Sequence, residues 1–244
     1  MTFDDLSKGL QAVLDGFAEW FDICRHPLLH CDKLLSLETD KEKIDKSLHL
    51  WLVVFLITLV LQLPLWKIAG IGWENVGFHL PNFLVATAGL MLIGVVLHLG
   101  LRIYGVPSNF ADTLVIYTTV GGVYSPLFLL VAYPAVVPIM TSMKNAKGQG
   151  LAFIPAMAFI FSNQMKISQP TGLQGVLYSV LTIPLVVGSF LVLTLMAHKV
   201  AAKYSVPKSK TLASFGFSMS VLMTPLWLGL VSLSYFIMYT FSGS

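Results

Sequence analysis

Uncharged apolar runs alternate with short polar segments from residue 48 to the C-terminus. A helix rises 1.5 Å per residue, so about 20 apolar residues cross the ~30 Å hydrocarbon layer of a bilayer. Four runs have this length and each predicts one spanning helix: 48–66, 81–101, 175–197 and 212–239. The runs are continuous, whereas a membrane β-barrel needs short segments of alternating polarity. The pattern therefore predicts an all-α polytopic membrane protein.

Two further runs depart from this length. Residues 113–143 are 31 uncharged residues, too many for one untilted span, and Pro126 predicts a kink within them. Residues 151–162 are too few to cross, so they predict a short re-entrant or interfacial segment. Pro225 predicts a second kink, in the last span. The prediction is thus five transmembrane helices plus one short segment that does not cross.

Residues 3–24 have the pattern of an amphipathic helix. Apolar side chains recur at steps of three and four residues and form one stripe. The opposite face is acidic, whereas a helix that senses anionic lipid would be basic there. We therefore expect the stripe to dock on the protein's own membrane domain or on a partner protein. The residues that we assign to partner docking are Leu10, Phe17, Trp20 and Phe21.

Charge divides the chain into two segments. Residues 1–47 hold six basic and ten acidic residues, and residues 48–244 hold nine basic and two acidic ones. This predicts a cytoplasmic acidic amphipathic segment, 1–47, followed by a transmembrane domain, 48–244. Five spans with the N-terminus inside place eleven basic residues in the cytoplasm and four outside. That distribution follows the positive-inside rule, and it places the C-terminus outside.

One stretch of sequence occurs twice in similar form. "HLGLRIYGVPSNFADTL" begins at His98, and "HKVAAKYSVPKSKTL" begins at His198. Five spans place both on one side of the membrane, which predicts equivalent turns in a parallel internal repeat of a two-helix hairpin; a chance likeness is the alternative. Prolines end the preceding helices and tyrosines suit the membrane interface, so we interpret four residues as structural joints. They are Tyr104, Pro107, Tyr204 and Pro207.

The candidate chemistry is sparse. His98 and His198 lie near one membrane face and could form a pH-sensing or polar site. The segment "CRHPLLHC" (24–31) contains four residues of the zinc-binding type, but its proline interrupts the helix, so no metal site is predicted. Phosphate-binding loops, catalytic triads and nucleic-acid-binding basic patches are absent from the sequence. We therefore expect no enzymatic activity, no cofactor and no nucleic-acid partner.

Residues 95–130, "VVLHLGLRIYGVPSNFADTLVIYTTVGGVYSPLFLL", resemble the Yip family of Ypt/Rab-interacting membrane proteins. There a span ends in a glycine-containing turn, an aromatic residue follows, and Thr-Leu opens a span with a proline inside it. The Asp-Leu-Tyr-Gly-Pro motif of eukaryotic members is absent, and "KIDKSLHLW" stands in its place. The resemblance therefore implies a bacterial relative, in the plasma (inner) membrane, that acts as a non-catalytic scaffold or adaptor.

Two functions stay open on these observations. In the first, the protein is a membrane scaffold that binds a partner protein through its N-terminal segment or organises the membrane. In the second, it is an oligomeric channel or transporter for an ion or small solute, lined by the proline-kinked third and fifth spans. The absence of charged residues in the middle of the spans weakens the second. The expected partners are the lipid bilayer, a protein and further copies of the chain.

Overall fold

The structure is a computed structural model that describes residues 3–71, 76–151 and 173–224, and a few single positions after residue 224. Within these ranges all regular secondary structure is helical, as the apolar runs predict. Among the described residues, three helices are long and apolar enough to cross a membrane: Asp40–Ala69, Phe110–Pro134 and Ile183–Tyr204. Pro225, most of the fifth predicted span and residues 152–162 of the predicted short segment lie outside the described residues.

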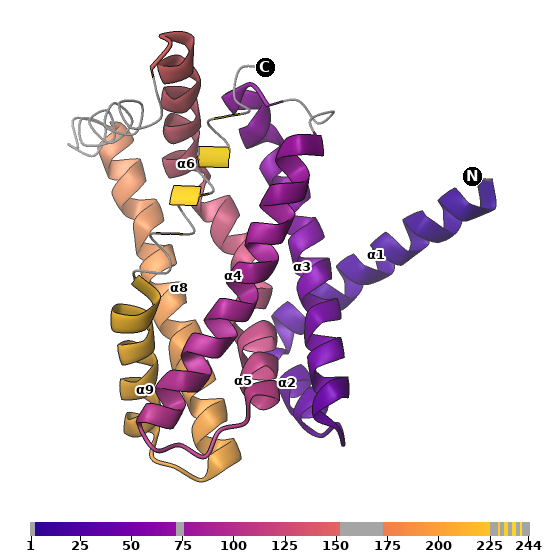
Figure 1. The fold of residues 1–244 in the computed structure, drawn as a ribbon, viewed down its shortest axis with the longest axis vertical. Coiled ribbons are helices and arrows are strands. Elements are labelled where there is room, and N and C mark those ends of the chain that lie inside the picture. The colour runs from indigo at the N-terminus through magenta and orange to yellow at the C-terminus, as the bar shows by residue number, and fades with distance from the viewer. Residues whose placement is uncertain are drawn as a thin grey trace. The chain divides into compact units, whose positions relative to one another are not determined.

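Three helices form the N-terminal part of the chain (Figure 1). α1 (Phe3–Arg25) lies where the amphipathic pattern predicts it, and Pro27 begins α2 (Pro27–Leu35), a position at which its missing N–H costs nothing. α3 (Asp40–Ala69) starts with a capping box. There the Glu42 N–H donates to the Thr39 hydroxyl at 3.2 Å, and the Thr39 N–H donates to the Glu42 carboxylate at 3.4 Å.

The third apolar run forms an interrupted helix. α4 (Val76–Ile103) precedes it, and the run then forms α5 (Phe110–Ile116), a π-helical turn (Tyr117–Gly121), a 3₁₀ turn (Gly122–Tyr124) and α6 (Ser125–Gly148). The irregular turns end directly before Pro126, which cannot donate a backbone hydrogen bond. A second hairpin follows, with α8 (Leu173–Tyr204), α9 (Lys208–Phe217) and a π-helical turn (Ser218–Met223).

Side chains stabilise the irregular turn before Pro126. The Thr118 hydroxyl donates to the Leu114 carbonyl at 2.9 Å, and the Thr119 hydroxyl donates to the Val115 carbonyl at 2.6 Å. These bonds satisfy carbonyl groups where the helical hydrogen-bond pattern changes. Gly121 also has a steric role, because a Cβ atom there would lie 3.1 Å from the Met196 sulfur. The interruption therefore depends on glycine and threonine as well as on proline.

The described chain forms two compact units. Unit 1 contains Met1–Val60, Leu97–Leu127 and Leu191–Gly216. One apolar cluster of its core is made by Ile23 of α1, Leu50 and Val54 of α3, and Val123 of the 3₁₀ turn. Unit 2 contains Leu61–Val96, Phe128–Phe190 and Phe217–Ser244. Within unit 2, α6 and α8 pack closely, since a Cβ atom on Gly188 would lie 2.9 Å from the ring of Phe128.

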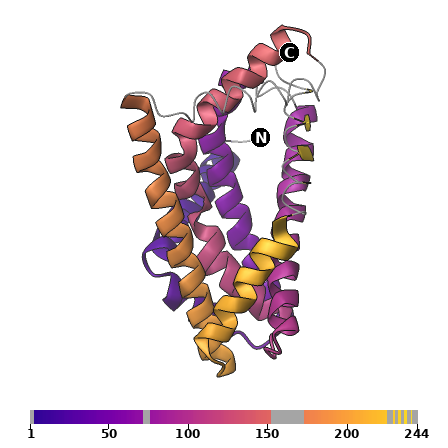
Figure 2. The same cartoon turned by 90° about the vertical axis from the view of Figure 1, so that its left-hand side faces the viewer.

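The two resembling turns, at residues 104–109 and 204–207, have the same backbone geometry. Both lie at one end of unit 1, at the bottom of Figures 1 and 2. Gly105 and Ser205 each have a positive φ, of 65° and 52°. The next N–H then donates to a carbonyl five residues back: Val106 to Leu101 at 2.9 Å, and Val206 to Ala201 at 3.1 Å. Both helices thus end in the left-handed cap that usually requires glycine.

This geometry predicts opposite effects of exchanging the two cap residues. Gly105→Ala should lower the free energy of unfolding by about 1 kcal/mol, because alanine is strained at positive φ. Ser205→Gly should raise it by up to about 1 kcal/mol for the same reason. Thermal unfolding in detergent measures both, with Gly216→Ala in α9 as the control, where a Cβ meets nothing within 4 Å. A Gly105→Ala variant as stable as the natural chain would contradict the prediction.

Candidate functional site

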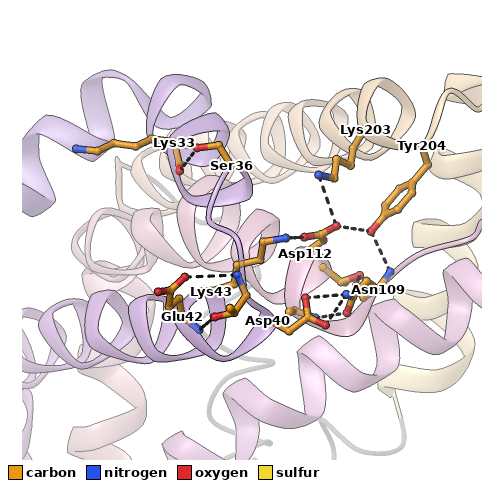
Figure 3. Close-up of polar contacts among 12 residues, drawn as sticks. Lys33, Ser36, Asp40, Glu42, Lys43, Asn109, Asp112, Lys203 and Tyr204 are labelled. Atoms are coloured by element: carbon orange, nitrogen blue, oxygen red, sulfur yellow. Dashed lines mark hydrogen bonds and ion pairs between the residues drawn. The ribbon is translucent and has the colours of Figure 1, made fainter.

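A buried carboxylate lies where the two turns meet the start of α3. Asp112 stands in the first turn of α5, and its side chain is 6% exposed. The Lys43 ammonium of α3 donates to Asp112 Oδ1 at 2.8 Å, and the Lys43 side chain is itself 10% exposed (Figure 3). The two charges are therefore removed from solvent together, and each neutralises the other.

The second oxygen of Asp112 is bound from α8. The Tyr204 hydroxyl donates to Oδ2 at 3.0 Å, and the Lys203 ammonium lies 3.8 Å from the same oxygen (Figure 3). The Tyr204 oxygen also accepts a hydrogen bond of 2.9 Å from the Asn109 backbone N–H. Both carboxylate oxygens thus have donors, as a buried charged group requires. The Tyr204 hydroxyl is therefore bonded to protein on both sides.

Asn109 ties the beginning of α5 to the beginning of α3. Its side-chain oxygen accepts from the Ala111 N–H at 3.0 Å, so Asn109 is the N-cap of α5. Its side-chain nitrogen donates to both oxygens of Asp40, at 2.8 and 2.9 Å (Figure 3). One short side chain therefore caps one helix and binds the first residue of another.

The two turns also contact each other directly. The Lys210 ammonium of α9 donates to the Gly105 carbonyl at 3.2 Å. The Thr211 hydroxyl donates to the Ala197 carbonyl of α8 at 3.1 Å, which holds the second hairpin closed. We call this assembly, the two turns together with Asp112, Lys43, Tyr204 and Asn109, the paired joint. Its polar groups are bonded to one another and hold the two turns and the start of α3 together.

α1 docks on the interrupted third helix by its inner face. The Trp20 indole N–H donates to the Val123 carbonyl at 2.8 Å, and the Tyr124 hydroxyl donates to the Cys24 carbonyl at 3.2 Å. Ile23 is buried in the same apolar core. Nearby, the Lys199 ammonium of α8 donates to Asp32 of α2 at 2.6 Å. Within unit 1, the N-terminal segment is therefore bound to the third helix and α8 by apolar and polar contacts.

The "CRHPLLHC" segment contains no assembled ligand set. Burial raises the pKa of the Cys31 thiol, and that of the Cys24 thiol, to about 11 in each case. Thiolate is the form that attacks electrophiles or binds metal, so burial disfavours the reactive form of both cysteines near neutral pH. His30 Nε2 lies 2.8 Å from the Asp22 carboxylate instead. No group of three or more metal-binding side chains occurs in the described part of the chain.

The predicted site residues are only partly brought together. Tyr204 joins the paired joint, whereas Pro107 and Pro207 are exposed in its turns. His98 Nδ1 lies 3.2 Å from the Ser108 hydroxyl, and its ring meets the Phe110 ring edge-on, with centroids 6.1 Å apart. His198 is exposed on α8. Among the described residues the two histidines are not hydrogen-bonded to each other, and Asp112 rather than histidine is the buried ionisable centre.

Of the four residues assigned to partner docking, Trp20 is turned inward to Val123, and Phe21 is 57% exposed. Phe17 is 39% exposed at the edge of a groove between α1 and α3. Leu10 lies in α1, but its side chain is outside the described residues. The stripe therefore divides into an inner part that docks and an outer part that is exposed.

Because the Lys43–Asp112 pair is buried, removing one partner should cost far more stability than removing both. Lys43→Met or Asp112→Leu alone should lower the free energy of unfolding by about 3–5 kcal/mol. Asp112→Leu leaves the buried ammonium without its carboxylate, and Lys43→Met leaves the carboxylate with only the more distant Lys203, at 3.8 Å. The double variant should recover most of that loss. Thermal unfolding in detergent measures this cycle, with Lys41→Met as the control, because Lys41 is exposed. Additive losses in the double variant would contradict the prediction.

The sequence matches no protein-family model, no curated protein and no solved structure.

Proposed function

We propose that the protein is a non-catalytic integral membrane scaffold that binds a partner protein through its N-terminal helix. The observation that carries this proposal is the way in which α1 is held. Trp20 and Ile23 fix its inner face to unit 1, so the remaining faces have a defined orientation. Because α1 is already ordered, binding of a partner would not include the entropic cost of ordering the helix.

Two outer faces of α1 differ in chemistry. Asp15, Glu19 and Asp22 recur at steps of four and three residues and form an exposed acidic ridge. Leu14 and Phe21, seven residues apart, form an exposed apolar strip beside it, with exposed fractions of 53% and 57%. A partner with a basic, amphipathic surface would complement both faces. The self-satisfied polar groups of the paired joint support a structural rather than a catalytic role.

The proposal includes the predicted topology. Five spans, a cytoplasmic N-terminus and an outer C-terminus agree with the three described helices that are apolar enough to cross and with the distribution of lysine and arginine. This arrangement would place the paired joint and α1 on the cytoplasmic side of a plasma (inner) membrane. It also suits a bacterial relative of the Yip family, on the resemblance of residues 95–130.

We also infer that the two hairpins are copies of one ancestral unit. The positive φ angles at residues 105 and 205 support this, as do the matching cap hydrogen bonds. In each hairpin the helix after the turn, α5 or α9, leads into a π-helical turn, at Tyr117–Gly121 and at Ser218–Met223. Turns of this kind are rare, so their recurrence at corresponding places favours duplication over chance.

A photo-crosslinking amino acid tests the scaffold proposal in living cells. Placed at Ala18, an exposed position between Phe21 and the acidic ridge, p-benzoylphenylalanine should form a protein adduct of defined mass. The same amino acid at Phe190 of α8, which is 69% exposed, is the control and should form none. Combining Asp15→Lys, Glu19→Lys and Asp22→Lys should abolish the adduct. If position 18 gives no protein adduct, or the charge reversal changes nothing, the scaffold proposal fails.

The interrupted third helix favours a second candidate, an oligomeric channel or transporter. Irregular π-helical and 3₁₀ turns occur often at functional sites and provide a place for a helix to bend. Under this alternative, protein reconstituted in vesicles should carry an ion or solute, and the His98→Ala/His198→Ala variant should change the pH dependence of that flux. Absence of flux between about pH 5 and 8, where histidine titrates, would exclude it.

A further inference from the structure

A groove of about 330 Å³ lies between α1 and α3. Gly16 and Phe17 form its α1 side, and the α3 side consists of residues between His49 and Val60, all of them apolar except His49. Leu52, Leu56 and Val60 are 40%, 47% and 52% exposed, so the groove is open along the outer face of α3. None of the described residues in its wall is Asp, Glu, Lys or Arg.

The position of the groove restricts what can occupy it. α3 is one of the helices long and apolar enough to cross a membrane. An apolar groove is poorly filled by water, since water needs polar partners to bind. A gap left empty would forfeit dispersion contacts along its whole length. In a bilayer, the hydrocarbon chain of a lipid needs no polar partners and can supply the dispersion contacts that an empty groove would lack.

The ends of the groove differ in polarity, as the ends of a lipid do. Lys46 is exposed one turn before His49 on the same face of α3. His49 Nε2 lies 4.0 Å from the Glu19 carboxylate of α1, so the polar mouth is shared by both helices. Beyond His49 the face continues with Val53, Leu56 and Val60. A phosphate would be attracted to Lys46, and an acyl chain would follow the apolar residues.

The length of this face matches one leaflet. From Lys46 to Val60 there are 14 residue steps, which at 1.5 Å each give about 21 Å along the helix. One leaflet, with its headgroups, is about 20–22 Å thick, half of the 40–45 Å of a bilayer. A phospholipid whose phosphate lies at Lys46 would therefore end its chain near Val60.

We propose that the groove between α1 and α3 is a phospholipid-binding site, in which one acyl chain lies along residues 49–60 and the phosphate is bound by Lys46. The site goes beyond the scaffold function, because it concerns a lipid rather than a protein partner. Its occupant completes the packing between α1 and α3. Lipid bound there is held between two helices, unlike lipid that merely surrounds the protein.

Lipid retention after purification tests the proposal. The full-length chain is extracted from membranes in mild detergent and washed, and its phospholipid is then measured by mass spectrometry per mole of protein. We expect the natural chain to retain phospholipid and Leu56→Trp, which fills the groove, to retain at least tenfold less. Leu191→Trp is the matched control, since Leu191 is 59% exposed on α8 and does not line the groove. Lys46→Gln should also reduce retention.

Equal phospholipid retention by Leu56→Trp and the natural chain would overturn the proposal. A loss of phospholipid in Leu191→Trp as large as that in Leu56→Trp would also overturn it, because it would indicate surrounding lipid only. Should Leu56→Trp fail to fold by circular dichroism, the natural chain gives an independent measurement. A phospholipid with a diazirine in its acyl chain should label residues 49–60 and 16–17 in preference to the exposed α8 surface at 183–191. Equal labelling of the two surfaces would overturn the proposal. Neither measurement depends on a protein partner, so failure here is distinguishable from failure of the scaffold proposal.

Discussion

One buried carboxylate fixes the ends of three helices. The Asp112 side chain is 6% exposed, and a carboxylate buried without partners would cost several kcal/mol, so the fold is stable only with its donors in place. Those donors come from far along the chain: Lys43 is 69 residues away and Tyr204 is 92. The start of α3, the start of α5 and the end of α8 must therefore assemble together. The positions of both turns follow from this requirement.

The docking of α1 depends on the same constraint through α5. α5 is seven residues long and buried from Ala111 to Ile116, and it connects Asp112, in its first turn, to the π-helical turn. That turn leads to Val123, whose carbonyl accepts the hydrogen bond from Trp20. A shift of Asp112 would move this carbonyl and with it the anchor of α1. The buried charge and the anchor of α1 are thus joined by a short, largely buried stretch of chain.

The all-helical class and the positions of the two turns could be predicted from sequence because apolar length, proline and glycine act locally. The residues of the site could not, because burial depends on how each helix is rotated. Lys43 lies between Lys41 and Lys46 in one charged segment, and nothing local marks it as the lysine that will meet a carboxylate. Trp20 and Phe21 are likewise neighbours in one apolar stripe. Only a carbonyl 103 residues away decides that Trp20 faces inward.

The rotation of α1 about its own axis orients both surfaces to which we assign functions, the groove with α3 and the acidic ridge. Successive residues in a helix are about 100° apart, so the contact of Trp20 with Val123 sets the direction of every other side chain. It directs Phe17 toward the groove on α3 and the acidic ridge of Asp15 and Glu19 away from the inner face. A lipid chain in the groove would favour this one rotation over others, because it fills the gap that this rotation leaves. Lipid binding and partner binding would then stabilise the same state of α1, and each would strengthen the other.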